Sequence, residues 1–276
     1  MKKILLSLSL IVFIGIVVAG ATGAFFSDTE TSTGNTFTAG AIDLKVDSEQ
    51  HYNGNVCVAD DGDGFIWEGD ADYPVAGTEC DGTWEGTDLG AQTFFNLTDV
   101  KPGDSGENTI SLHVLNNDAW ACVDVNLTKN NDNSSTEPEL ESGDVAENLS
   151  DDMDGELAQN VYFTAWGDDG DNIWEVNEPL LFSNISGPAS DVLGGETYAL
   201  ADSVTNNGAV MTGDSTRYIG LAWCMGTQTV NQSGNTITCD GASMGNGTQT
   251  DSMEASIAFR VEQARNNDQF VCSRPE

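Results

Sequence analysis

The segment Met253-Glu-Ala-Ser-Ile-Ala-Phe-Arg-Val-Glu262 decides the fold class, because apolar and polar residues alternate along its whole length. The residues expected to share the apolar face are Met253, Ala255, Ile257, Phe259 and Val261. An alternation of period two is typical of a β-strand that buries one face. Residues 108–115 and 119–128 repeat the pattern, so they are predicted to be strands as well.

Shorter strand candidates fill most of the remaining chain. They are residues 37–46, 93–97, 161–166, 197–200, 218–224 and 236–239. Turn signals such as Pro102-Gly103-Asp104 separate them, and strands do not alternate with helices. Many short strands joined by glycine-rich turns predict an all-β protein, an antiparallel β-sandwich or jelly roll.

One acidic stretch departs from the strand pattern. Residues 137–156 contain nine acidic side chains and no basic one. Apolar residues recur at every fourth position from Val145 to Leu157, which favours a short amphipathic helix, whereas two glycines favour a solvated loop. Both alternatives stay open. The stretch is assigned to an insertion of about residues 129–159 within a jelly-roll domain of residues 39–276.

The N-terminus has the features of a secretory signal peptide. A cationic start at Lys2 and Lys3 precedes residues 4–26, which carry no charge, and small residues offer cleavage after Ala21 or Ala24. A retained membrane anchor is the alternative, since such a run is long enough to span a bilayer. We expect residues 1–24 to be removed, giving a secreted or cell-surface protein that contacts the membrane only through the uncleaved leader.

Charge and cysteine content agree with export. The chain of 276 residues has 45 acidic and 9 basic side chains and a net charge of −36, which excludes nucleic acid as a partner because phosphate needs a basic surface. An even number of cysteines, 6, predicts three disulfides in an oxidising compartment. Among the possible pairings we favour two that close local loops, leaving the third by default. The pairs are Cys57–Cys80, Cys224–Cys239 and Cys122–Cys272.

N-glycosylation sequons are frequent, although an Asn- and Thr-rich chain also forms them by chance. The candidate acceptors are Asn96, Asn126, Asn133, Asn148, Asn184, Asn231 and Asn246. They make a surface glycoprotein one possible reading of the sequence.

The segment after the cleavage site carries a distinctive motif. It starts with Phe25-Phe26-Ser27-Asp28 and continues to Phe37-Thr-Ala-Gly-Ala-Ile-Asp-Leu44. This resembles the signature of the TasA/camelysin family of secreted biofilm-matrix and surface-fibre proteins. Residues 95–104, with their Pro-Gly-Asp turn, and residues 257–267 resemble two further family segments. The resemblance covers about a third of the chain and excludes residues 46–93, the acidic insertion and the cysteines.

The resemblance implies a jelly roll that polymerises into fibres by donor-strand exchange. Residues 25–38 would be the donor segment, and further copies of this chain, with other matrix proteins, would be the partners. The assembly residues would be Phe25, Phe26, Ser27, Asp28 and Phe37. The composition suits this role independently: residues 25–38 are rich in Thr and Ser, lack proline, and could satisfy the open edge of a neighbouring sheet. The alternative is an ordinary first strand.

Catalytic motifs are not found in the sequence. The resemblance to camelysin implies a metalloprotease as one alternative, but His51 and His113 are the only histidines and no H-E-x-x-H occurs. Residues 103–106, Gly-Asp-Ser-Gly, are similar to a serine-protease nucleophile loop but are better explained as a β-turn after Pro102. The protein is therefore predicted not to be an enzyme.

Calcium is the one cofactor that the sequence favours. Residues 60–68, Asp-Asp-Gly-Asp-Gly-Phe-Ile-Trp-Glu, recur as residues 168–175 in a form one residue shorter. Closely spaced carboxylates are hard oxygen ligands, although two acidic surface turns would give the same pattern. The predicted ligands are Asp61, Asp63, Asp169, Asp171 and Glu175. Together these features predict a structural subunit of an extracellular fibre or biofilm matrix, with a monomeric surface module that binds calcium or glycans as the alternative.

Overall fold

A computed structural model describes residues 42–62, 64–90, 92–144, 151–182 and 186–273. The predicted signal peptide, residues 1–24, and the predicted donor segment, residues 25–38, lie outside the described residues. All of the described residues belong to the compact unit that begins at Ile42. Among its described residues, no helix is both long and apolar enough to cross a membrane.

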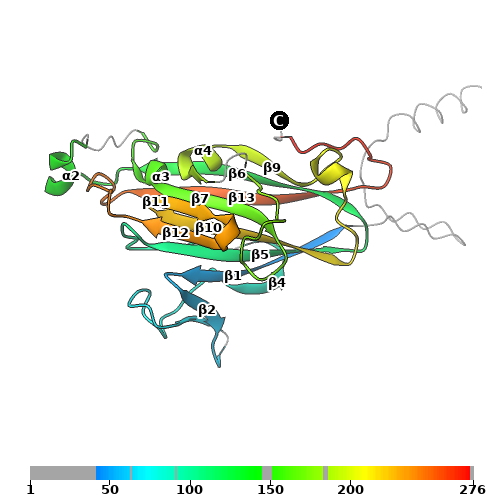
Figure 1. The fold of residues 1–276 in the computed structure, drawn as a ribbon, viewed down its shortest axis with the longest axis horizontal. Coiled ribbons are helices and arrows are strands. Elements are labelled where there is room, and N and C mark those ends of the chain that lie inside the picture. Colours follow the sequence, from blue (N-terminus) through cyan, green and yellow to red (C-terminus); the bar gives the residue numbers. More distant parts are fainter. Residues whose placement is uncertain (1–41, 63, 91, 145–150, 183–185, 274–276) are drawn as a thin grey trace, which may run out of the picture. The chain divides into compact units, whose positions relative to one another are not determined.

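Two antiparallel sheets form a β-sandwich, as predicted, and their strands run roughly alongside one another (Figure 1). The larger sheet has the strand order β3-β2-β1-β5-β10-β7-β8, and β4 also pairs with β1. Its strands are β1 (Asp43–Tyr52), β2 (Asn55–Ala59), β3 (Phe65–Glu68), β4 (Trp84–Thr87), β5 (Ser105–Leu115), β7 (Val161–Asp168), β8 (Gly187–Pro188) and β10 (Ser215–Met225).

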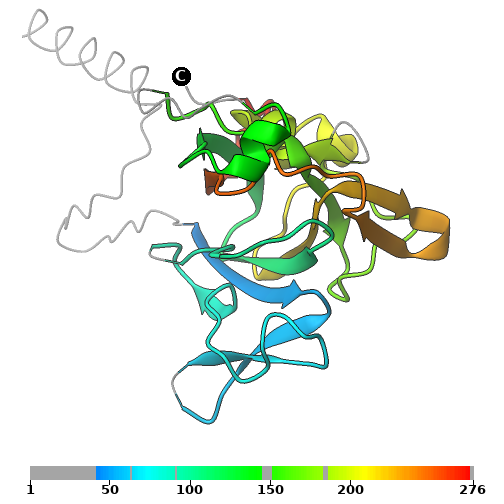
Figure 2. The same ribbon diagram turned by 90° about the vertical axis from the view of Figure 1, so that its left-hand side faces the viewer.

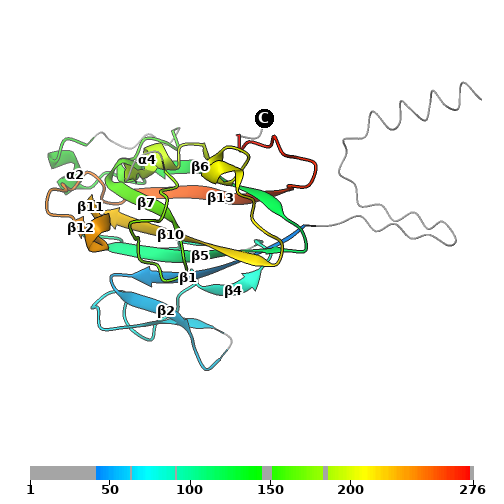
Figure 3. The ribbon, with the colours of Figure 1, turned by 45° about the vertical axis from the view of Figure 1, so that its right-hand side comes forward.

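The smaller sheet has three strands in the order β13-β6-β9. They are β6 (Ala119–Asn131), β9 (Glu196–Ala201) and β13 (Ser252–Gln263). A separate hairpin pairs β11 (Thr227–Asn231) with β12 (Thr236–Asp240), and it projects to one side of the sandwich in Figure 2. Strands β2 and β3 extend away from the smaller sheet (Figure 3).

The core lies between the two sheets and follows the alternation seen in the sequence. From β5, the side chains of Ile110, Leu112 and Val114 are buried. The first part of β6, residues 119–123, is buried on both faces, whereas Asn126 and Thr128 farther along the outer face are exposed. In this first part Cys122 is buried, and Trp120 donates from Nε1 to the carbonyl of Asn267 at 2.7 Å. The C-terminal segment therefore covers the outer face at the start of β6.

The three disulfides are those predicted: Cys57–Cys80, Cys122–Cys272 and Cys224–Cys239. Two close loops of 23 and 15 residues, and the third joins residues 150 positions apart. Disulfides are typical of extracellular proteins, which agrees with a secreted chain.

Residues 93–97, predicted as a strand, are not one. Phe94 is buried, and its carbonyl accepts hydrogen bonds from Gln50 Nε2 at 3.1 Å and from Asn108 Nδ2 at 3.3 Å. Side-chain amides of β1 and β5 thus bond the backbone that a neighbouring strand would otherwise pair. The segment packs its aromatic rings into the core as an irregular plug.

The first described strand, β1, continues past the predicted end at residue 46 as far as Tyr52, and so it includes His51. The turn follows one residue later, at Asn53 and Gly54, whose φ angles are 50° and 89°. Positive φ at both turn residues is the requirement of a two-residue type I′ hairpin, which Asn-Gly meets best. The turn joins β1 to β2, with Tyr52 opposite Asn55.

The acidic insertion contains two separate short helices, α2 (Glu137–Glu141) and α3 (Leu157–Asn160), and not one helix through its apolar positions. Met153 is 49% exposed, so the fourfold spacing does not make a buried face. Strand β6 continues to Asn131, so its last residues overlap the predicted insertion of about residues 129–159. Residues 145–150 lie outside the described residues.

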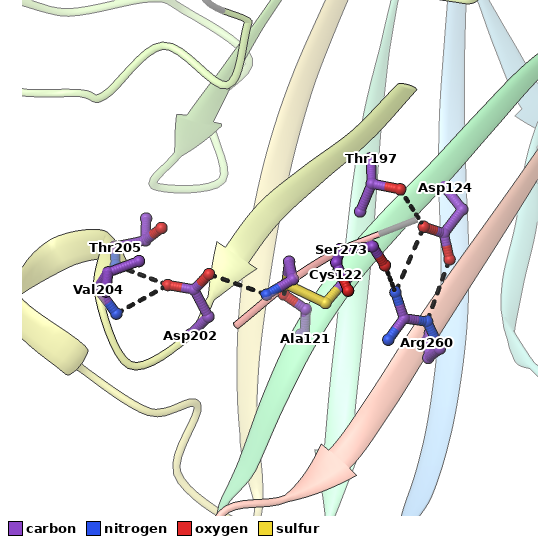
Figure 4. The surroundings of a disulfide bond; sticks show 10 residues. Ala121, Cys122, Asp124, Thr197, Asp202, Val204, Thr205, Arg260 and Ser273 are labelled. Atoms are coloured by element: carbon purple, nitrogen blue, oxygen red, sulfur yellow. Dashed lines mark hydrogen bonds and ion pairs between the residues drawn. A yellow bond between two sulfur atoms is a disulfide. The ribbon is translucent and has the colours of Figure 1, made fainter. Parts of the chain in front are cut away.

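Figure 4 shows how the C-terminal segment is tied to the smaller sheet. Asp202, 2% exposed, accepts hydrogen bonds from the backbone N–H groups of Val204, Thr205 and Cys272 at 3.0, 2.6 and 3.1 Å. Nearby, Asp124 on β6 bonds Arg260 on β13 at 3.2 Å. Burial alone would raise the pKa of Asp202, but the backbone donors outweigh burial and lower it.

We expect Asp202→Asn to destabilise the fold near neutral pH by about 1–3 kcal/mol, because an amide accepts these bonds less well than a carboxylate. A carboxylate whose pKa is lowered on folding contributes stability above its ordinary pKa, and this contribution is lost as the pH falls through the folded-state value. Urea unfolding at a series of pH values checks this: the difference between wild type and variant should shrink below about pH 4. A difference that stays constant down to pH 2 would contradict the assignment.

Candidate functional site

Strand β13 is the outer strand of the smaller sheet, and among the described strands it pairs only with β6. It has 12 residues, and its apolar side chains at positions 257, 259 and 261 are only partly buried. Phe259 reaches the core through an edge contact with Phe94, with ring centroids 6.1 Å apart. The strand therefore presents a long second edge whose apolar face is incompletely covered.

The residues predicted to make the assembly contact lie before the described part of the chain. Phe25, Phe26, Ser27, Asp28 and Phe37 are all among the residues outside it. Their contacts with β13, or with any other edge, remain a prediction.

The first predicted calcium loop shows no gathered carboxylates among its described residues. Asp60 accepts from the N–H groups of Gly62 and Gly64 at 2.8 and 3.2 Å, so its carboxylate closes a local turn. Asp61 is exposed, and Asp63 lies outside the described residues. The part of this loop that is described thus fits the alternative, an acidic surface turn.

The second predicted loop brings only one of its predicted ligands into a cluster. Asp169 groups with Asp168 and Glu178, with oxygens that all lie within 4.8 Å of one another. Asp171 bonds the N–H of Ile173, and Glu175 is not part of the group. Asp168 and Glu178 were missed because neither position follows the Asp-x-Asp spacing.

The carboxylates of this second cluster already accept hydrogen bonds from N–H groups of the chain itself. Asp168 accepts from Trp166 Nε1 at 2.9 Å and from the N–H groups of Gly170 and Asn172. Glu178 accepts from the N–H groups of Asp169 and Glu175 at 3.0 and 2.8 Å. These bonds explain how the carboxylates tolerate one another here without a cation.

A third acidic cluster was not foreseen from the sequence. Asp132, Glu139 and Asp144 lie with oxygens within 4.8 Å of one another, and Asp132 and Glu139 are buried. It forms where the end of β6 meets α2, at the end of the sandwich where the chain enters β13 (Figure 1). Acidic clusters of this kind can hold a metal ion such as calcium.

The two histidines do not share a site. His51 lies opposite Glu107 in the β1–β5 ladder, and His113 lies opposite Lys45. Residues 45 and 51 are six positions apart on β1, which separates the two rings by about 20 Å along the strands. His113 instead lies 2.6 Å from Asp47, and His51 lies 3.1 Å from Glu49. This arrangement cannot place both imidazoles on one zinc ion.

A small cavity of about 170 Å³ lies on the outer face of the larger sheet, beneath the β11–β12 hairpin. His51, Ser105, Glu107 and Trp223 contribute to its lining. Burial raises the pKa of Glu107, and the adjacent His51 opposes that effect. Its volume is below the roughly 300 Å³ typical of small-molecule sites.

The first half of the Gly-Asp-Ser-Gly segment lies in a turn after Pro102, and its second half begins β5. The N–H of Asp104 donates to the carbonyl of Lys101 at 2.9 Å, and Gly103 has a φ of 94°. Strand β5 begins at the next residue, Ser105.

Five of the predicted glycosylation acceptors are exposed in the described structure. They are Asn96, Asn126, Asn133, Asn231 and Asn246. The other two, Asn148 and Asn184, lie outside the described residues. Exposure of these side chains is compatible with glycosylation.

No protein-family model matches this chain, and a search of curated proteins finds none that is similar. The likeness to the TasA/camelysin family therefore depends on the motifs quoted above.

Proposed function

We propose that the mature chain is a structural, non-catalytic subunit of an extracellular fibre or biofilm matrix. Residues 25–38 of one subunit would add a strand to the sheet of the next, as the TasA/camelysin resemblance implies. Donor and acceptor are different surfaces of the same chain, so the contact would be heterologous and would extend into an open filament.

The observation that carries this proposal is that β13, among the described strands, pairs along one edge only, with β6. Soluble monomers usually protect edge strands by keeping them short, by adding proline, or by covering them. Strand β13 has 12 residues, no proline, and a partly uncovered apolar face. An added strand would satisfy the edge N–H and C=O groups and bury the half-exposed apolar side chains.

Two further features support an extracellular role. The three disulfides suit an oxidising compartment. The net charge of −36 keeps individual subunits soluble until a specific contact forms.

Deletion of residues 25–38 from the secreted form is expected to abolish filaments while leaving the sandwich folded. Electron microscopy would report filaments, and circular dichroism would report the fold. A peptide of residues 25–38 added to the deleted protein should raise its melting temperature without restoring filaments, because the peptide fills the acceptor edge and carries no further subunit.

A matched control is Val204→Ala, since Val204 is an apolar side chain, 68% exposed, outside β13. This variant should form filaments normally. Filaments that persist after deletion would refute donor-strand assembly. A protein that never polymerises under any condition would favour the second candidate, a monomeric surface module that binds calcium. The acidic clusters are the observation that supports this second candidate.

A further inference from the structure

The cluster of Asp132, Glu139 and Asp144 gathers three acids from the stretch of chain that follows β6. Asp132 directly follows β6, Glu139 lies on α2, and Asp144 follows that helix. Asp251, the residue before β13, and Glu156, the residue before α3, border the same cluster.

Two of these carboxylates are removed from water. Asp132 is 4% exposed and Glu139 is 0% exposed. Burial of an ionised carboxylate costs several kcal/mol unless a cation or hydrogen bonds compensate it. The ion pairs of the described residues include none with Asp132, Glu139, Glu156 or Asp251.

The stretch of chain that carries most of these acids contains no basic residue. No Lys or Arg occurs between Lys129 and Arg217. Lys129 itself bonds Glu254 at 2.8 Å, across the β6–β13 pair. Beyond the hydrogen bonds that these acids accept, any neutralising charge would have to come from protons or from a bound ion.

Within the described part of the chain, several buried oxygens in and around the cluster have no hydrogen-bond partner. They are Oδ1 of Asp132, Oδ1 of Asp251 and Oε2 of Glu156. Buried polar atoms nearly always have a hydrogen-bond partner. A group of buried oxygens without such partners therefore indicates a place for a cation.

The other carboxylate oxygens are held in place by donors from the insertion and from the β13 approach. Glu139 accepts from the N–H of Thr136 and from Thr250 Oγ1. Asp251 accepts through Oδ2 from the N–H groups of Glu156 and Leu157 at 2.7 and 3.0 Å. Each of these acids is thus oriented before any ion binds.

The electrostatics of the cluster agree with this geometry. Burial, followed by the charges of Asp144 and Glu139, raises the pKa of Asp132. Burial and the neighbouring carboxylates raise the pKa of Glu156 to about 7 and that of Asp251 to about 6. The acids repel one another strongly when no cation lies between them.

We propose that Asp132, Glu139 and Asp144 form the centre of a calcium site, with Asp251 and Glu156 as further ligands. Calcium binds six to eight oxygens at about 2.3–2.6 Å, so oxygens on opposite sides of the ion lie about 5 Å apart. The cluster oxygens, within 4.8 Å of one another, fit that span. Magnesium requires a smaller and more regular octahedron of about 2.1 Å bonds.

Calcium at this place would link the end of β6, the acidic insertion and the start of β13. Asp132 would supply a ligand from the end of β6, Glu139 and Asp144 from the insertion, and Asp251 from the start of β13. The ion would therefore fix the insertion on the sandwich and anchor the first residues of the edge strand. This role is independent of filament formation.

Calorimetry and thermal unfolding of the mature chain with CaCl₂ test the site. A background of about 1 M NaCl screens loose counterion binding to the acidic surface, because the Debye length is then about 3 Å. We expect one saturable calcium site and a calcium-dependent rise in melting temperature, with a much smaller effect of MgCl₂ at the same concentration.

The variants Asp132→Asn and Glu139→Gln should each weaken calcium binding at least ~10-fold, since affinity follows the number of ligand charges. Without calcium, Asp132→Asn should melt at a higher temperature than wild type, because it removes a repelling charge. A variant that binds calcium more weakly but melts at a higher temperature without calcium distinguishes a metal site from a purely structural role. Its melting transition also shows that the variant folds.

Glu137→Gln is the matched control on the same helix, because Glu137 is exposed. Asp169→Asn tests the cluster on residues 168–178. Both variants should bind calcium like wild type. The proposal is overturned if wild type shows no saturable calcium binding, if Asp132→Asn and Glu139→Gln retain it, or if Asp169→Asn removes it. Filaments, scored separately, bear only on the assembly proposal.

Discussion

Removing the Cys122–Cys272 disulfide by replacing both cysteines with alanine is expected to lower the free energy of unfolding by about 5 kcal/mol. In the chain-entropy account, a crosslink stabilises by restricting the unfolded chain, and the effect grows with the logarithm of the loop length. This bond joins residues 150 positions apart. It also ties the C-terminal segment over β6, where Cys122 is fully buried.

The matched control is the Cys224–Cys239 pair, which closes a loop of only 15 residues. Its removal should cost about 3 kcal/mol by the same relation. Guanidinium unfolding of the two double variants under identical conditions gives both values. Equal losses for the two pairs, or a smaller loss for Cys122–Cys272, would contradict an entropic origin and point to local packing instead.

Asp104→Ala is expected to cost about 3–4 kcal/mol, although the residue lies in a turn. Its carboxylate accepts from Tyr52 Oη at 2.8 Å, from Asn53 Nδ2 at 2.9 Å and from the N–H of Lys101 at 2.8 Å. Tyr52 is only 2% exposed, and burial, reinforced by Asp104, raises the pKa of its hydroxyl. Truncation would leave that hydroxyl buried without an acceptor.

A double-mutant cycle isolates this contact. Tyr52→Phe removes the unsatisfied hydroxyl, so the double variant should lose less stability than the sum of the two single variants. Asp99→Ala is the control, because Asp99 forms an exposed ion pair with Lys101 that is worth less than about 1 kcal/mol. Additive losses in the cycle, measured by urea unfolding, would show that Asp104 does not act through Tyr52.

These contacts give the Pro-Gly-Asp turn a structural meaning. Asp104 connects the turn before β5 with the Asn53–Gly54 turn of the β1–β2 hairpin. The hydrogen bond from Gly103 N–H to the carbonyl of Met225 adds β10 to the same end of the larger sheet. The turn therefore aligns three strands, which supports a scaffolding interpretation over the nucleophile loop that its Gly-Asp-Ser-Gly sequence superficially resembles.

Where a strand buries one face, its residues could be predicted directly from the alternation. Strands β5, β6 and β13 lie where the period-two pattern placed them, because each side chain's direction follows from its position along the backbone. Residues 93–97 were also predicted to be a strand, but they do not form one. Phe94 is buried and Phe95 and Leu97 are partly buried, but side-chain amides of β1 and β5 replace the strand partner.

The candidate metal sites show the limit of reading local spacing. The repeated Asp-rich loops predicted five ligands, and only Asp169 lies in a cluster among the described residues. The acids of the buried cluster, Asp132, Glu139 and Asp144, show no Asp-x-Asp spacing, and the bordering Asp251 is far from Asp132 in the sequence. Only the pairing of β6 with β13, which sets Asn131 opposite Ser252, brings them together.

The fold class, the disulfide pairs and the acidic, export-compatible character of the chain could all be predicted from the amino-acid sequence. These properties depend on periodicity, residue counts and short loops, which are local or additive quantities. Three-dimensional contacts were needed to find that β13 pairs only with β6 among the described strands, that Asp104 bonds Tyr52, and that buried acids meet beside α2. Such contacts join distant segments, and their geometry follows from strand order and register, which no local pattern encodes.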